Sequence, residues 1–185
     1  MPHSLPARLA WSGLALLLLA TPAVARARRD PNATDLKTVF LTKPPPDFTF
    51  DATTGPTHLH DLAGAPVVLN FWASYCEPCR AELGAFAKIA ATYGDAVRVL
   101  TVSEDEAGKA REFLQANGFA GLPVVEDPGR QIFDLYAVTP IPATVIIDRS
   151  GAVSRVVVGE MEWAELKSDI DAELTPAGSP AAASR

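Results

Sequence analysis

A short apolar segment that runs directly into a Cys-x-x-Cys pair constrains the fold of this chain more than any other feature. Residues 67–72, VVLNFW, are rich in β-branched and aromatic side chains, as is typical of a central strand covered on both faces. Apolar residues then recur at helical spacing, which predicts an amphipathic helix over residues 76–93. A strand therefore delivers Cys76 and Cys79 to the start of a helix.

Strands and helices are predicted to alternate along most of the remaining chain. A Gly-Pro turn between two short alternating segments favours a β-hairpin at the start of the domain. The whole pattern predicts an α/β fold with a central mixed β-sheet, helices on both faces and an N-terminal β-hairpin extension. The predicted hairpin strands are 48–50 and 57–60, the further strands are 97–102, 143–147 and 153–158, and the further helices are 106–117, 130–136 and 163–174.

The first residues are typical of a secretory signal peptide. Arg8 precedes the apolar segment Leu9–Ala20, and Ala23-Val24-Ala25 has the small-x-small pattern of a cleavage site. Residues 1–25 are therefore predicted to be a signal peptide; the alternative is an uncleaved membrane anchor over Leu9–Ala25, which is at the short limit for a span. An exported, periplasmic protein is expected, and the anchored form would remain attached to the membrane.

The remaining segments divide by composition. Residues 26–46 are basic, then polar, and end in three prolines, which favours an extended tether. The folded domain is predicted over residues 47–174. Residues 175–185 contain mainly Ala, Ser, Pro and Gly, and we expect them to be disordered.

Charge and cysteine content exclude several classes of function. The net charge of −6 gives no basic surface for nucleic acid. Two residues between the cysteines close too small a loop to restrict the unfolded chain much, so the pair points to chemistry rather than to a structural staple. A closed zinc site needs about four ligands, and the chain offers only these cysteines with His3, His58 and His60. No metal and no cofactor is expected.

The position of the pair predicts which cysteine attacks. A helix N-terminus stabilises a thiolate through its unpaired N–H groups and its dipole, and Cys76 lies at that end. Pro78 falls in the first turn, where its missing N–H breaks no helical bond. Cys76 should attack and Cys79 should resolve. The negative charge of Glu77 opposes the thiolate of Cys76, which favours a reducing protein over a strong oxidant.

Residues 71–79, FWASYCEPC, resemble the active-site segment of thioredoxin-like proteins, specifically the TlpA/ResA-type branch of periplasmic thiol-disulfide oxidoreductases. The resemblance covers about residues 47–174. Residues 136–144, YAVTPIPAT, are similar to the segment that places a cis-proline beside the redox pair in that family, and Pro142 is the matching residue. From the residues alone, a trans proline that opens a strand is the alternative.

The resemblance also implies roles for further residues. Glu82 matches a family glutamate one turn after the second cysteine, so it is a candidate proton acceptor for Cys79; the alternative is a solvated helix carboxylate. Ile141 and Pro142 are expected to pair with an extended segment of the client. Trp72, Tyr75 and Pro78 are the other residues expected to contact the client. Trp72 and Tyr75 are expected to be packing and rim residues rather than catalysts.

One position departs from thioredoxins but matches the TlpA/ResA branch, and two others depart from the family pattern. The thioredoxin Asp in the strand before the cysteines is replaced by Asn70, as in the TlpA/ResA branch. Pro140 stands where the family often has Gly, and Gly84 where it often has Pro, so the start of the cis-proline loop and the kink of the first helix are expected to differ.

The function expected from these features is disulfide reduction in client proteins, of the cytochrome c maturation or copper-site assembly type. The expected partners are those clients and a membrane thiol donor such as a CcdA/DsbD-like reductant, and a monomer is expected. The alternative is a thioredoxin-fold copper-binding assembly protein that uses the cysteines with His58 or His60, whose spacing would place both imidazoles on one face of a strand. A peroxiredoxin-type peroxidase is disfavoured by Ala73, which replaces the activating Thr, and an interaction domain with an inactive disulfide is the last alternative.

Overall fold

The computed structural model describes residues 44–52 and 55–175, which belong to one compact unit. The predicted signal peptide or anchor, most of the predicted tether and the tail after residue 175 lie outside the described residues. Across the described stretch, every helix is too short or too polar to cross a membrane.

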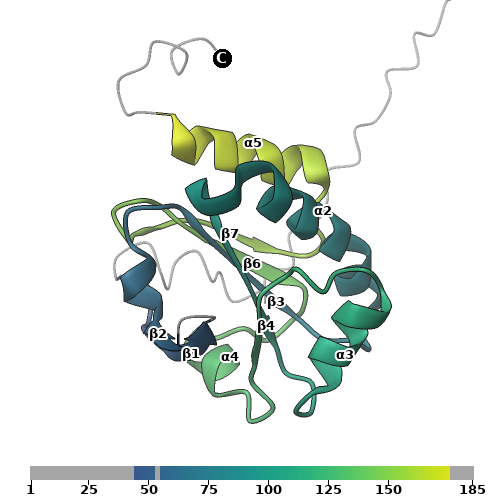
Figure 1. Ribbon diagram of the computed structural model, residues 1–185. Helices are drawn as coiled ribbons and strands as arrows, with labels where there is room; N and C mark the ends of the chain where they lie inside the picture. The colour runs from purple at the N-terminus through teal and green to yellow at the C-terminus, as the bar shows by residue number, and fades with distance from the viewer. Residues whose placement is uncertain (1–43, 53–54, 176–185) are drawn as a thin grey trace, which may run out of the picture. The chain divides into compact units, whose positions relative to one another are not determined.

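A five-stranded mixed sheet forms the centre of this unit, in the order β5-β4-β3-β6-β7 (Figure 1). β3 and β4 are parallel, as are β4 and β5, whereas β6 is antiparallel to both β3 and β7. The fold is therefore thioredoxin-like, as predicted. The strands are β3 Val67–Trp72, β4 Arg98–Ser103, β5 Val124–Glu126, β6 Ala143–Ile147 and β7 Val153–Val158.

The central strand β3 is buried along its whole length, which explains its nearly continuous apolar sequence. Successive side chains of a strand point to opposite faces, so Val68 and Trp72 join one core cluster while Leu69 and Phe71 join the other. The strand thus anchors both halves of the core, and its C-terminal end is a rigid base for the segment that follows.

Helices cover both faces of the sheet. α2, α3 and α5 share one core cluster, while α4 packs with the N-terminal hairpin on the opposite face (Figure 1). Both parallel crossovers, through α2 and through α3, therefore lie on one side. The helices are η1 Leu59–Leu62, α2 Glu77–Tyr93, η2 Gly94–Ala96, α3 Lys109–Ala116, α4 Gln131–Leu135 and α5 Trp163–Leu174.

The N-terminal hairpin consists of β1 Thr49–Ala52 and β2 Gly55–His58, and it is anchored by Phe48. The ring of Phe48 is buried with its centroid 6.0 Å from that of Tyr136. Pro45 is buried, and the Pro46 carbonyl accepts a 2.7 Å hydrogen bond from the Tyr136 hydroxyl. The packed chain therefore includes two prolines that were predicted to belong to the tether.

Two predicted elements need correction, and one strand was missed. The second hairpin strand ends at His58 rather than residue 60, because the chain turns into η1. The helix predicted from residue 106 begins only at Lys109, since Gly108 has a left-handed conformation with φ 86°. The short strand β5 was not predicted; it is only half-buried, and its three residues follow Pro123.

Candidate active site

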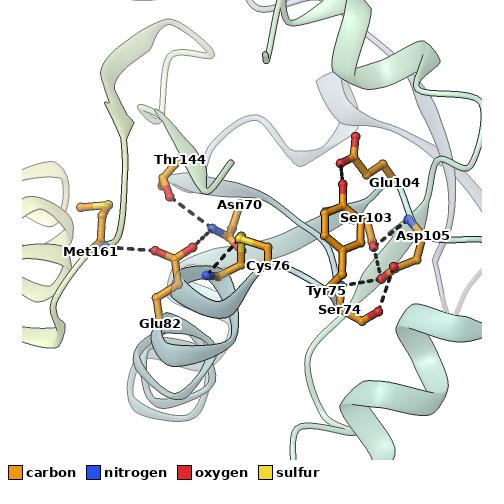
Figure 2. The surroundings of a disulfide bond; sticks show 11 residues. Asn70, Ser74, Tyr75, Cys76, Glu82, Ser103, Glu104, Asp105, Thr144 and Met161 are labelled. Carbon is orange, nitrogen blue, oxygen red and sulfur yellow. Dashed lines mark hydrogen bonds between the residues drawn. A yellow bond between two sulfur atoms is a disulfide. The ribbon is translucent and has the colours of Figure 1, made fainter. Parts of the chain in front are cut away.

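Cys76 and Cys79 form a disulfide at the N-terminus of α2, directly after β3 (Figure 2). Cys76 is the N-cap residue of the helix, and its Sγ accepts a hydrogen bond from the backbone N–H of Cys79 at 3.3 Å. Pro78 occupies the first turn, as its fixed φ and missing N–H allow. The helix start thus presents an N–H donor to the sulfur that must carry negative charge in the reduced protein.

The two sulfur-bearing residues differ in exposure. Cys76 retains 8% of its surface, whereas Cys79 is fully buried. Around Cys76, the Pro78 and Glu77 side chains are exposed and Tyr75 is 67% exposed. A partner sulfur approaching from solvent therefore meets Cys76 first, with Cys79 behind it.

Glu82 lies one turn after Cys79 on α2 and is only 2% exposed. Its Oε1 accepts a hydrogen bond from the Asn70 side-chain amide at 2.7 Å, and its Oε2 accepts one from the backbone N–H of Met161 at 2.9 Å (Figure 2). Burial raises the pKa of Glu82 to about 7, although these hydrogen bonds oppose the shift. The side chain is thus not the solvated helix carboxylate that the sequence also allowed.

Asn70 links this carboxyl group to the neighbouring strand. Its amide also donates to Thr144 Oγ1 on β6, at 3.3 Å, and the residue is fully buried. Asn70 holds one oxygen of Glu82 without itself exchanging a proton at neutral pH. The carboxyl group of Glu82 is consequently the titratable group of this buried cluster.

Pro142 immediately precedes β6, and the Ile141–Pro142 peptide bond is cis. Phe71 near the end of β3 pairs with Ala143 at the start of β6, so Pro142 lies at the sheet end from which β3 leads to Cys76. Pro142 is buried and Ile141 half-buried, in contact with the core cluster that includes both cysteines. The structure therefore places the predicted proline loop and the redox pair at the same edge of the sheet.

Trp72 needs correction as a predicted client contact. Its side chain is fully buried and packs against Phe113, with ring centroids 5.7 Å apart. The apolar ring fills the core below the redox pair, so a client cannot touch it without unpacking α3. Its predicted role as a packing residue agrees with this position.

Two carboxylates that sequence reasoning missed flank the segment before Cys76. Asp105 accepts hydrogen bonds from the Ser74 backbone N–H at 2.7 Å and from the Ser74 hydroxyl at 2.9 Å, while Glu104 accepts one from the Tyr75 hydroxyl (Figure 2). Both follow β4, which is parallel to β3. The sequence did hold a signal for this proximity: both segments directly follow adjacent parallel strands, whose carboxyl ends meet at one edge of the sheet.

The predicted histidine pair lies on different elements, His58 at the end of β2 and His60 in η1. The Nδ1 atoms of His58 and His60 lie 2.9 Å and 3.6 Å from the carboxylate of Asp47. They therefore do not share the face of one strand. Among the described residues, no group of three or more His, Cys, Asp or Glu side chains is arranged to hold a metal ion.

Comparison with known proteins agrees with this geometry. The model of the AhpC/TSA family matches residues 41–156. The thiol-disulfide oxidoreductase ResA of Bacillus subtilis (strain 168) is 38% identical over 63% of this chain and 66% of that protein. ResA of Geobacillus kaustophilus (strain HTA426) is 30% identical over 86% of this chain and 91% of that protein.

A solved structure extends the similarity to the backbone. The thiol:disulfide interchange protein DsbE from Chlorobium tepidum superposes with a TM-score of 0.65 at 35% identity, over 72% of this chain and 96% of that one. The redox pair at the helix start and the sheet order fit the same class. The chain belongs to the AhpC/TSA family and is a thioredoxin-fold thiol-disulfide oxidoreductase of the ResA and DsbE type.

Proposed function

We propose that this protein is an exported reductase that transfers two electrons from the Cys76–Cys79 dithiol to disulfides of client proteins. The observation that carries the proposal is the unequal exposure of the pair, 8% for Cys76 and zero for Cys79, at a helix N-terminus. A client disulfide can reach Cys76, and the mixed disulfide that forms is then within reach of Cys79.

In the first step, the Cys76 thiolate attacks one sulfur of the client disulfide. The bond between Cys76 and that sulfur forms as the client S–S bond breaks, and the departing client thiolate takes a proton from solvent. The Cys79 backbone N–H, 3.3 Å from Cys76 Sγ, stabilises the attacking thiolate.

In the second step, Glu82 accepts the proton of the Cys79 thiol. The Cys79 thiolate attacks Cys76 Sγ, the intramolecular disulfide forms, and the second client thiolate departs and is protonated. A carboxyl group with a pKa of about 7 suits this transfer, because it is partly ionised at neutral pH and can both take and release a proton. The client gains two electrons, and the protein loses them.

The surface around Cys76 fits a protein client. Tyr75 and Pro78 are exposed beside it, and Ile141 precedes Pro142 at the same sheet edge. We assign to Ile141 and Pro142 the pairing with an extended client segment, and to Tyr75 and Pro78 the contacts that flank it.

Clients of the cytochrome c maturation or copper-site assembly type fit this chemistry, since both need reduced cysteines in an oxidising compartment. Residues 1–25 would direct export, residues 26–46 would act mainly as a tether, and a membrane dithiol protein of the CcdA/DsbD type would reduce the disulfide again. We propose that the protein acts as a monomer. The exposed Glu77 between the cysteines opposes the Cys76 thiolate and so favours the reducing direction.

A redox titration of the full chain tests the direction of transfer. We expect a midpoint potential well below about −180 mV, which is the value typical of protein disulfide isomerase. A higher value would reverse the assigned direction. The Cys79→Ser variant should accumulate clients disulfide-bonded to Cys76, with the Cys76→Ser/Cys79→Ser variant as the control, and absence of any trapped client would contradict the mechanism.

A further inference from the structure

A chain of polar contacts joins the two loops at the active-site edge. We name residues 73–76 the Cys76 loop and residues 138–142 the Pro142 loop. The Tyr75 hydroxyl donates to Glu104, Glu104 forms an ion pair with Arg130, and Arg130 Nη2 donates to the Val138 carbonyl at 3.1 Å. One carboxylate and one guanidinium thus connect the residue before Cys76 to the first residue of the Pro142 loop.

The backbone of Arg130 is fixed at the start of α4. It has a left-handed conformation with φ 55°, which is uncommon for a residue other than glycine. Its N–H donates to the Asp127 carbonyl at 2.9 Å, and its carbonyl accepts from the Asp134 N–H at 2.8 Å. Its guanidinium lies 4.9 Å from the centroid of the Phe133 ring. These contacts hold the guanidinium in one orientation between Glu104 and Val138.

The Glu104–Arg130 pair differs from an ordinary surface ion pair. The Glu104 side chain is only 8% exposed and that of Arg130 is 40% exposed, whereas the Arg98–Asp95 pair, at the other end of β4, has side chains 43% and 95% exposed. Exposed pairs contribute little, but removing one partner of a buried pair leaves an uncompensated charge. Because its carboxylate is shielded from water, the Glu104–Arg130 pair constrains both loops more strongly than the Arg98–Asp95 pair constrains its surroundings.

Fixed spacing between these loops matters only for a large substrate. Under the proposed function, on which this inference rests, a protein client contacts Cys76 and the Pro142 loop at the same time. Small displacements of aligned groups are costly in rate. A small disulfide reacts with the redox pair without contacting the Pro142 loop. We propose that Glu104 and Arg130 are positioning residues that hold the Cys76 loop and the Pro142 loop in register for protein clients.

The test compares two substrates of the full chain, with insulin as the protein disulfide and 2-hydroxyethyl disulfide as the small one. Glu104→Gln removes the charge and keeps the side-chain shape. We expect kcat/KM for insulin to fall about tenfold while the value for the small disulfide stays within about twofold. Arg98→Gln breaks the exposed pair at the other end of β4 and is the matched control; neither rate should change.

A second variant keeps the test decisive if Glu104→Gln weakens folding. Arg130→Met removes the guanidinium that joins Glu104 to the Val138 carbonyl, and we expect a loss of similar size, again confined to insulin. The losses from Glu104→Gln and Arg130→Met should not add, because both break the same connection.

Several outcomes would overturn the inference. Equal losses for both substrates would mean that Cys76 itself is perturbed, and an unchanged insulin rate would mean that the connection has no role in client reaction. If the unaltered chain reduces the small disulfide but not insulin, the proposed function itself fails, and this inference fails with it.

Discussion

Two buried carboxyl groups lie near the redox pair, and they are held differently. Asp105, 4% exposed, accepts hydrogen bonds from the Ser74 N–H, the Ser74 hydroxyl and the Ser103 hydroxyl. Glu82, 2% exposed, accepts from Asn70 and from the Met161 N–H, and burial raises its pKa to about 7. The two carboxyl groups are therefore buried to a similar extent, but Asp105 accepts three hydrogen bonds and Glu82 accepts two.

From this difference we expect Asp105 to act as an anchor and Glu82 to act as a proton acceptor. Asp105 binds a backbone N–H and hydroxyls that belong to the segment before Cys76 and to the end of β4, so its contacts fix the position of a loop. Glu82 lies among apolar core residues behind Cys79, where burial outweighs its hydrogen bonds. We therefore expect changes at Glu82 to appear in rate and pH dependence, and changes at Asp105 to appear first in stability.

The largest expected effect is kinetic. Glu82→Gln should slow the release of client from the mixed disulfide with Cys76 by about 100-fold at pH 7, since general bases contribute about 10²–10⁴-fold. Single-turnover kinetics with a preformed mixed disulfide would measure it. Glu162→Gln alters an exposed carboxylate with no capping bond and should change nothing. An unchanged release rate for Glu82→Gln would leave Glu82 with a packing role only.

Asp105→Ala should lower the free energy of unfolding by about 3 kcal/mol, because the donors of Ser74 and Ser103 lose a charged acceptor. Urea denaturation of the oxidised protein would measure the loss. The exposed Asp171, which pairs with Lys167 on α5, offers the control: Asp171→Ala should cost less than about 1 kcal/mol. Equal costs for the two variants would show that Asp105 is no anchor.

The pH dependence of stability should come partly from Glu82. Its pKa of about 7 in the folded protein exceeds the usual 4.5, so between these values the folded state binds more protons than the unfolded state. The stabilisation is complete below about pH 4.5 and is lost as the pH rises through 7, by at most about 1.4 kcal/mol per pH unit. Urea denaturation at several pH values should show this slope in the unaltered protein and a shallower slope in Glu82→Gln. Identical slopes would contradict the raised pKa.

Much of the fold followed from local patterns. The sheet strands 67–72, 143–147 and 153–158 and the helix 163–174 have the bounds that their apolar periodicity predicted. β5 was missed because three half-buried residues carry too little pattern for a strand to be predicted. Long, strongly patterned elements were therefore predictable, whereas an element that exists only through pairing with β4 was not.

The site divides in the same way. Cys76, Cys79 and Pro78 are neighbours in sequence, so their arrangement at a helix start could be predicted. The carboxyl group of Glu82 is buried and accepts a hydrogen bond from the Met161 N–H, 79 residues away, and only the family resemblance pointed to this residue. The contact of Asp105 with Ser74 spans 31 residues; the parallel pairing of β3 and β4 indicated that these segments are near each other, but no local pattern marked the contact itself. Roles that depend on distant contacts need the folded chain.

The smallest expected effect isolates one bond of the anchor. Ser74→Ala removes the hydroxyl bond to Asp105 at 2.9 Å but leaves the backbone N–H bond at 2.7 Å, so the free energy of unfolding should fall by about 1 kcal/mol. Ser150→Ala breaks a similar Ser–Asp bond in an exposed turn, where water replaces the lost partner, and should cost about half as much or less. Urea denaturation of both variants measures the difference. A larger loss at Ser150 would mean that burial does not strengthen the contacts of Asp105. Asp105 and Glu82 would then differ only in the raised pKa of Glu82.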